Sequence, residues 1–166
     1  LAEVAPGWDG VLAEMDSLGN TLWSKRYDSS EIDGFNSGIR LSDSGFSMIG
    51  STQGVDPYWD AHILKTDSTG EVVLSRTFDG GAGEVGRNIV EASDGGCFIL
   101  SNSSSFGSIS SMWVIKTDST GFGDCFQDSV TTVVTDVDLG WADFQLESFS
   151  STYMEYSTGF GVHRGT

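Results

Sequence analysis

The chain has 166 residues, including 22 Gly and only 2 Pro, and its 24 acidic residues against 8 basic ones give a formal charge of −16. Such a charge repels the phosphates of nucleic acids and anionic membrane surfaces, which excludes nucleic-acid binding as a function class. No apolar run reaches about 18 residues, so the sequence predicts no membrane-spanning helix.

A repeat of 51 residues organises most of the chain, because the segment that begins at Trp8 returns at Trp59 without a gap. Residues 116–121 open a third copy and are identical to residues 65–70. The abundance of Gly, Ser and Thr suits short strands joined by tight turns better than helices. Chance does not place so many matches at one spacing, so each copy is expected to be one structural unit.

Each full copy is expected to contain four short antiparallel strands. The motif Asp-Ser-x-Gly joins the first two strands, with Asp at the start of a type I turn and Gly at its end. Asp43-Ser44-Gly45 and Asp94-Gly95-Gly96 separate the third strand from the fourth, which is predicted over residues 46–49 and 97–100. A four-stranded meander that recurs in tandem is typical of a β-propeller blade, because one such sheet cannot bury both faces alone.

An apolar pair occurs at the same point of each copy and predicts strands buried on both sides, as between neighbouring blades. About twelve strands are expected in all, which make about three blades, whereas closed propellers use about four to eight. Closure is therefore expected from a longer chain, from several copies that complete a ring, or from open sheets whose edges another subunit covers. The apolar pairs are Val11 with Leu12, Ile63 with Leu64, and Val114 with Ile115.

The pattern changes after the third copy opens. A β-branched run covers residues 131–134, and apolar and polar residues alternate within residues 141–149, as in a half-buried strand. These features predict a capping or closing β segment with a tail over residues 122–166, after the repeats of residues 1–121. The expected fold is all-β, with tandem four-stranded antiparallel meanders that form about three β-propeller-like blades and a C-terminal β cap.

Three motifs of the repeat occur together: Lys-Thr-Asp-Ser-x-Gly over residues 65–70 and 116–121, a Leu-Trp-Ser-Lys-x-Tyr strand over residues 22–27, and Ser-Asp-Gly-Gly over residues 93–96. This combination resembles the tandem β-propeller-like repeats of large proteins that Bacteroidota secrete, and the resemblance covers about residues 8–121. It implies export, commonly by the type IX secretion system, and an extracellular or cell-surface location. It implies no catalytic residue in this chain.

No catalytic motif accompanies the repeat. His62 and His163 are the only histidines and lack the spacing of a zinc site, and neither a Gly-x-Ser-x-Gly elbow nor a phosphate-binding loop occurs. A carboxylate pair for glycoside hydrolysis is defined by its separation in space, so the sequence leaves that alternative open. The chain is expected not to be an enzyme.

Three aromatic residues precede the first strand of successive copies and are candidate ligand-binding residues: Trp8, Tyr58 and Trp59. Exposed rings of this kind stack on sugars or anchor a protein partner. Burial between blades is the ordinary structural alternative, and Trp23 and Trp113, which lie within predicted strands, are expected to be packing residues.

Asp16, Asp67 and Asp118 recur in the turns and are candidate Ca²⁺ ligands. Each of these turns offers one carboxylate where strong calcium loops alternate about three, so a plain turn residue is the structural alternative. No other metal and no cofactor is expected. A second acidic candidate near the predicted cap comprises Asp136, Asp138 and Asp143.

Cys97 and Cys125 are the only cysteines, and the first lies in a predicted strand while the second follows the last repeat motif. They are candidates for a disulfide that closes the loop between them, and two buried free thiols are the alternative.

The expected function is that of a non-catalytic extracellular structural or interaction module, used in surface assembly or adhesion through protein partners or self-assembly. The alternatives are a carbohydrate-binding module, for which glycans are the ligands, and an accessory domain of a larger secreted hydrolase. Neither a nucleic-acid partner nor membrane insertion is expected.

Overall fold

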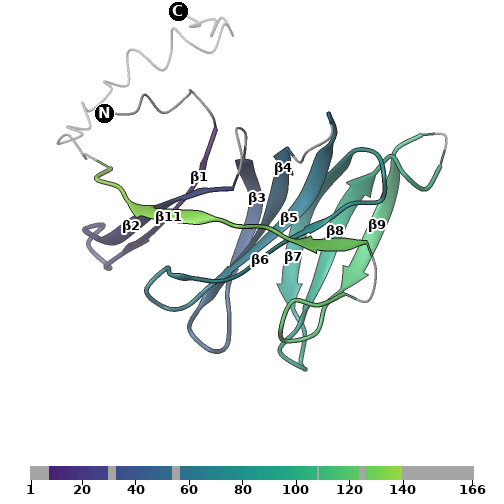
Figure 1. Cartoon of the computed structure of the whole chain (residues 1–166). Helices are drawn as coiled ribbons and strands as arrows, with labels where there is room; N and C mark the ends of the chain where they lie inside the picture. Colours follow the sequence, from purple (N-terminus) through teal and green to yellow (C-terminus); the bar gives the residue numbers. More distant parts are fainter. Residues whose placement is uncertain (1–7, 30–32, 54–56, 108, 124–125, 140–166) are drawn as a thin grey trace, which may run out of the picture.

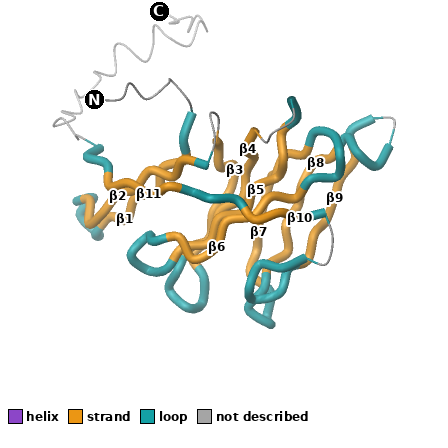
Figure 2. Tube along the Cα trace, in the orientation of Figure 1, coloured by secondary structure: helices purple, strands orange, loops and turns teal. Residues whose placement is uncertain are grey.

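The structure is a computed structural model and describes residues 8–29, 33–53, 57–107, 109–123 and 126–139. These residues form strands and loops and no helix, so none of them belongs to a helix able to cross a membrane (Figure 2). The strands are β1 (Gly10–Met15), β2 (Thr21–Asp28), β3 (Asp33–Arg40), β4 (Phe46–Gln53), β5 (Trp59–Thr66), β6 (Val72–Phe78), β7 (Glu84–Glu91), β8 (Cys97–Ser103), β9 (Ser111–Lys116), β10 (Gln127–Ser129) and β11 (Val133–Asp136).

The strands form three antiparallel sheets that pack face to face (Figure 1). The first sheet has the order β1-β2-β11, the middle sheet β10-β6-β5-β4-β3 and the third sheet β7-β8-β9. The prediction of an all-β antiparallel fold is therefore confirmed.

The prediction of three four-stranded blades, each made from one copy of the repeat, is wrong in its grouping. Each copy is divided after its second strand, so β1 and β2 lie in the first sheet while β3 and β4 pair with β5 and β6 of the next copy. The cause is the long antiparallel ladder between β4 and β5, which runs from Phe46 opposite Thr66 to Gln53 opposite Trp59. The sheets are thus displaced by half a repeat, and the described residues form no closed ring.

The described part of the C-terminal segment contributes one edge strand to each of two sheets. Strand β10 pairs with β6 at the edge of the middle sheet, and β11 pairs with β2 at the edge of the first sheet. Figure 1 shows this segment as a green band that runs across the sheets. The strand predicted from the β-branched run is confirmed as β11, whereas the strand predicted over residues 141–149 lies outside the described residues.

Two hydrophobic layers hold the three sheets together. The layer between the middle and third sheets contains Ile49, Ile63, Phe78, Ile99 and other fully buried side chains. The layer between the first and middle sheets contains three buried residues, Tyr27 from the first sheet and Met48 and Leu64 from the middle sheet. The middle sheet is therefore covered on both faces, because it lies between the other two.

Burial of the apolar pairs differs from the prediction at both ends of the stack. Ile63 and Leu64 in the middle sheet are 1% and 0% exposed, as expected for a strand buried on both sides. In contrast, Val11 in the first sheet is 49% exposed and Val114 in the third sheet is 60% exposed. The prediction is wrong for these two residues because, among the described residues, each end sheet has a neighbouring sheet on one face only.

The turns follow the local chemistry of the sequence. Gly19, Gly70 and Gly121 close the three Asp-Ser-x-Gly turns with φ angles of 85°, 80° and 72°. These angles lie in the left-handed region, which glycine adopts without the steric cost that a Cβ atom brings. Each turn also has a backbone hydrogen bond from this glycine N–H to the carbonyl of the starting Asp.

Candidate functional site

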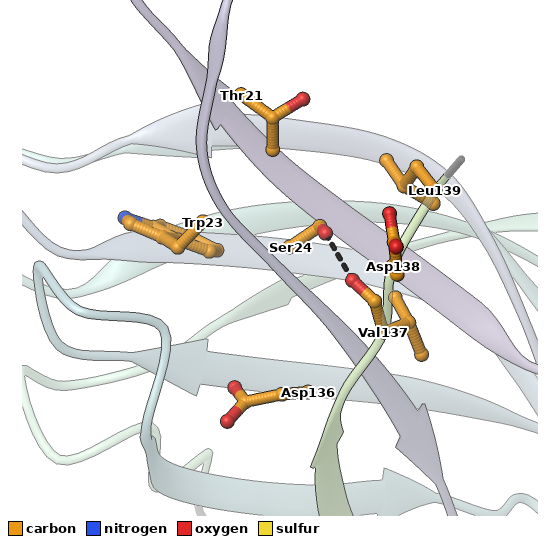
Figure 3. A pocket seen from close by; sticks show the side chains of 7 residues that line it. All are labelled: Thr21, Trp23, Ser24, Asp136, Val137, Asp138 and Leu139. Atoms are coloured by element: carbon orange, nitrogen blue, oxygen red, sulfur yellow. Dashed lines mark hydrogen bonds between the residues drawn. The ribbon is translucent and has the colours of Figure 1, made fainter. Parts of the chain in front are cut away.

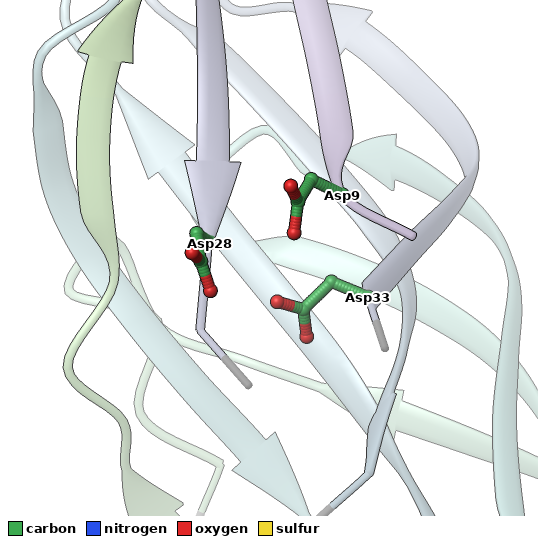
Figure 4. Close-up of side chains that lie close together, drawn as sticks. All are labelled: Asp9, Asp28 and Asp33. Carbon is green, nitrogen blue, oxygen red and sulfur yellow. The ribbon is translucent and has the colours of Figure 1, made fainter. Parts of the chain in front are cut away.

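Three carboxylates meet where the chain crosses from the first sheet to the middle sheet. Asp9 immediately precedes β1, Asp28 ends β2 and Asp33 begins β3, and one oxygen of each lies within 4.8 Å of the others. Figure 4 shows the three side chains pointing toward one another from these three elements. Asp33 is buried, and the other two are half-buried.

The same cluster recurs at the crossing from the middle sheet to the third sheet. It consists of Asp60, Asp79 and Glu84, which stand 51 residues after Asp9, Asp28 and Asp33. Asp60 and Glu84 are buried, and Asp79 is half-buried. The two acidic clusters are therefore part of the repeat.

The third carboxylate of each cluster stabilises the crossing loop. Asp33 Oδ2 accepts a hydrogen bond from the backbone N–H of Ser29, and Glu84 Oε2 accepts one of 2.9 Å from the N–H of Gly80. Ser29 and Gly80 are also equivalent at the 51-residue offset. Glu84 Oε1 accepts further hydrogen bonds from the Ser103 hydroxyl, at 2.7 Å, and from a neighbouring serine. These bonds give the third carboxylate a structural role, because they satisfy backbone donors at a point where the ladder is interrupted.

The surroundings of Asp9, in the first acidic cluster, shift the pKa of its carboxyl group. Burial, and next the negative charge of Asp28, raise the pKa of Asp9, while Arg26 opposes this shift through an ion pair of 3.3 Å between its Nη1 and Asp9 Oδ2. Carboxylate oxygens so close together are ligands of the type that Ca²⁺ takes, although calcium sites commonly supply about six to eight oxygens. Within the described ranges, these two clusters are the groups of residues best placed to hold a divalent cation.

The Asp residues predicted as calcium ligands lie elsewhere, each in its own turn. Asp67 Oδ1 accepts hydrogen bonds from the backbone N–H of Thr69 at 2.8 Å and of Glu71 at 3.0 Å. Asp16 and Asp118 bond their turns in the same way, and hydrogen bonds lower the pKa of all three carboxyl groups. The structure does not bring these three residues together, and their geometry is that of turn residues.

The aromatic candidates have different surroundings. Trp8 is 79% exposed and Tyr58 is 49% exposed, whereas Trp59 is half-buried at the start of β5. The alternative prediction, that these rings are buried between blades, is therefore wrong for Trp8, which precedes the first strand of an end sheet. In the sequence, Trp8 directly precedes Asp9 and Trp59 directly precedes Asp60, so the first acid of each acidic cluster follows a tryptophan.

An open pocket of about 590 Å³ lies between β2 and the segment that follows β11. Trp23 and two carboxylates reach its walls, and the Ser24 hydroxyl donates a hydrogen bond to the carbonyl of Val137 (Figure 3). Asp136 also binds Lys25 Nζ at 2.9 Å, which joins the end of β11 to β2. An aromatic ring beside carboxylates and hydroxyls suits a sugar-like ligand. The residues that line the pocket are Thr21, Trp23, Ser24, Asp136, Val137, Asp138 and Leu139.

Trp113, predicted to be a packing residue, lies half-buried against the core between the middle and third sheets, as expected. Cys97 also belongs to this core, where burial raises the pKa of its thiol and a hydrogen bond with Ser47 opposes the shift. Cys125 lies outside the described residues, so the disulfide stays a prediction.

His62 lies in β5 with its ring buried between the first and middle sheets. Its Nε2 is 2.8 Å from the Ser75 hydroxyl, and its ring lies 5.9 Å from that of Phe35. Burial lowers the pKa of His62 to about 4. The residue is therefore a neutral packing residue at physiological pH.

No protein-family model matches the chain, and no curated protein matches it. The described residues define an all-β protein of stacked antiparallel sheets with a carboxylate cluster repeated at each crossing between sheets. The resemblance to secreted Bacteroidota repeats stays a prediction that rests on the sequence motifs.

Proposed function

We propose that the protein is a non-catalytic interaction module whose sheets stack like propeller blades and whose open end faces bind other proteins outside the cell or on its surface. The extracellular location comes from the motif resemblance. The observation that carries the proposal is the outer face of the third sheet, which presents a cluster of apolar side chains. The apolar residues of this outer face are Val90, Phe98, Leu100, Met112 and Val114, and the polar residues Asn88, Asn102 and Lys116 lie on the same face.

The outer face is apolar across neighbouring strands and not only at single positions. Val90 on β7 pairs with Phe98 on β8, and Leu100 on β8 pairs with Val114 on β9. Four of the five apolar residues are exposed, and all of them except Met112 line a hollow of about 120 Å³. A contiguous apolar patch on a chain of formal charge −16 is typical of an interaction site, because single exposed apolar residues do not form such rows.

Photo-crosslinking on intact cells tests the proposal. The photoreactive residue benzoyl-phenylalanine replaces Val114 on the outer face or, as the matched control, Val73 on β6, which is 62% exposed. We expect irradiation to yield an adduct with a surface protein from position 114, identified by mass spectrometry, and little or none from position 73. Equal yields at the two positions, or no adduct at position 114, would overturn the proposal.

Carbohydrate binding is the second candidate function, and the pocket beside Trp23 is the observation that favours it. A glycan array probed with the whole chain tests it, with Trp23→Ala for the pocket and Trp8→Ala or Trp59→Ala for the rings predicted from the sequence. Binding that Trp23→Ala abolishes would support this candidate and locate the site. An array without a bound glycan would exclude it.

A further inference from the structure

The 51-residue repeat shows what kind of surface covers the outer face of the third sheet. Each apolar residue of this face has an equivalent in the middle sheet, one repeat earlier: Val90, Phe98, Leu100, Met112 and Val114 correspond to Ile39, Ser47, Ile49, Ala61 and Ile63. The strand pairing is also conserved, since Leu100 lies opposite Val114 just as Ile49 lies opposite Ile63. The two surfaces therefore have the same layout.

In the middle sheet this surface is largely covered by the third sheet, and only Ile39 at its edge is half-buried. Ile49, Ala61 and Ile63 are at most 1% exposed, because they pack against the third sheet through a layer that includes Ile99 and Ile115. The equivalent surface of the third sheet has the same apolar layout but no cover among the described residues. The expected cover is a sheet with residues equivalent to Trp113 and Ile115, which β9 contributes to this layer.

The first sheet offers such a surface on its own outer face. Ala13 stands two repeat lengths before Ile115, and Val11 stands two repeat lengths before Trp113, which packs against the same core. Val11 is exposed and Ala13 is half-buried, and both lie on the side of β1 opposite Leu12, which packs against the middle sheet. Val133 on β11 is also exposed. The outer face of the first sheet thus repeats the β9 part of the surface that covers the middle sheet, whereas β7 and β8 have no counterpart in it.

We infer that a second copy of this chain docks head to tail, with the outer face of its first sheet on the outer face of the third sheet. The inference rests on the proposed interaction function and names the partner. Such an interface joins two different surfaces, so repetition produces a ring if the rotation closes and a filament if it does not. Copies of the same strong negative charge repel one another, so added salt is expected to strengthen the association by screening the repulsion.

Light scattering coupled to size-exclusion chromatography, and analytical ultracentrifugation, test the inference on the whole chain of 17.7 kDa. Val114→Asp disables the third-sheet face, Val11→Asp disables the first-sheet face, and Val73→Asp is the control at an exposed valine outside both faces. Met112→Asp is a second variant of the third-sheet face, and circular dichroism checks that each variant folds. We expect wild type and the control to associate as concentration and salt rise, and each face variant to associate at least about tenfold more weakly.

A mixture of the two face variants distinguishes the geometry. Head-to-tail docking leaves one intact face on each variant, so Val114→Asp mixed with Val11→Asp is expected to form a one-to-one dimer that does not grow further. If Val11→Asp has no effect while Val114→Asp abolishes association, third sheets pair with each other and the inference is overturned. Monomeric wild type at every concentration and salt level also overturns it. An adduct of position 114 with a different surface protein would then leave the interaction function standing without the second copy.

Discussion

Acidification is expected to destabilise the protein through His62, before its carboxylates lose their charge. The His62 side chain lies in β5 with 1% exposure, between Phe35 and the Ser75 hydroxyl. Burial is the main cause of its lowered pKa, and the charge of Asp33 opposes the shift. Protonation would place an imidazolium ion in this apolar layer, so the folded protein resists it while the unfolded chain does not.

The sign and size of the effect follow from the two pKa values. The unfolded histidine takes up a proton near its ordinary pKa of 6.5, whereas the folded one does so only near pH 4. Between these values the unfolded state binds more protons, so the free energy of unfolding falls as the pH falls. Each pKa unit corresponds to about 1.4 kcal/mol, which makes the total loss roughly 3 kcal/mol. Above pH 6.5 the effect is absent, because both states are neutral.

Urea unfolding at about pH 7.5 and about pH 4.5 measures the loss, and His62→Gln removes the responsible group while keeping a polar partner for Ser75. His163→Gln is the control for the other histidine, and it should retain the full loss. The turn carboxylates do not confuse this window, because their lowered pKa values move their contribution to pH values below their ordinary 3.8. The reasoning is refuted if His62→Gln loses as much stability between the two pH values as wild type does.

Three further predictions concern packing, the turns and the acidic clusters. Gly50→Ala is expected to lower the free energy of unfolding, measured in urea, by more than about 3 kcal/mol or to prevent folding, because the new Cβ would clash with the backbone of Gly34. Gly83→Ala is the control: its Cβ meets no atom within 4 Å, so stability should change by less than about 1 kcal/mol. Asp67→Ala removes the acceptor of two turn amides and should cost about 1 kcal/mol, equally with calcium and with a chelator; a cost found only with calcium would indicate a metal ligand. Asp9→Asn in calcium-free buffer should raise the melting temperature at pH 7, because the raised pKa of Asp9 means that its charged form is disfavoured in the folded state. The gain should shrink as the pH falls toward that pKa. A lower melting temperature of the variant at pH 7 would contradict this prediction.

Strand and turn positions were predictable because their causes are local. The strands predicted from residues 46 and 97 begin at these residues in the structure, directly after turns rich in Asp and Gly. The turn glycines have the positive φ angles that the motif requires. These features depend on side chains within about four residues of one another, so one sequence suffices to identify them.

The grouping of strands into sheets could not be predicted, because two connections in each repeat lack a tight-turn motif. The chain crosses between sheets after β2, yet it returns into the same sheet after β4. Length does not separate the crossings from the turns, because β6 and β7 are joined by five residues, as β5 and β6 are. The difference arises from ladder pairing between distant residues. One sequence signal marks the crossing: an acid begins the strand after the loop, Asp33 in one copy and Glu84 in the next, and accepts the amide that follows the previous strand.

The acidic clusters were missed for a related reason. The acids predicted as ligands were those that recur in turns, Asp67 and its equivalents, but their carboxylates accept hydrogen bonds from the backbone of their own turns. Asp9, Asp28 and Asp33 recur at the same offset, but they come from three different elements, and only the crossing between sheets brings them within 4.8 Å. A search for acids conserved between copies outside the turn motifs would have found all three.

The end faces show why a repeated pattern defines an interface more strongly than exposure alone. Ile63 and Val114 occupy equivalent positions, yet one is fully buried and the other is 60% exposed, because burial depends on the neighbouring sheet and not on the strand itself. An apolar residue at an exposed position contributes to an isolated sheet only through its cross-strand neighbours, and it lowers the solubility of the chain. Its presence is explained if the exposed position is covered in the working assembly, as the equivalent position is covered within the chain. The repeat accounts for the internal interface, and the proposed docking of a second copy uses the same kind of packing.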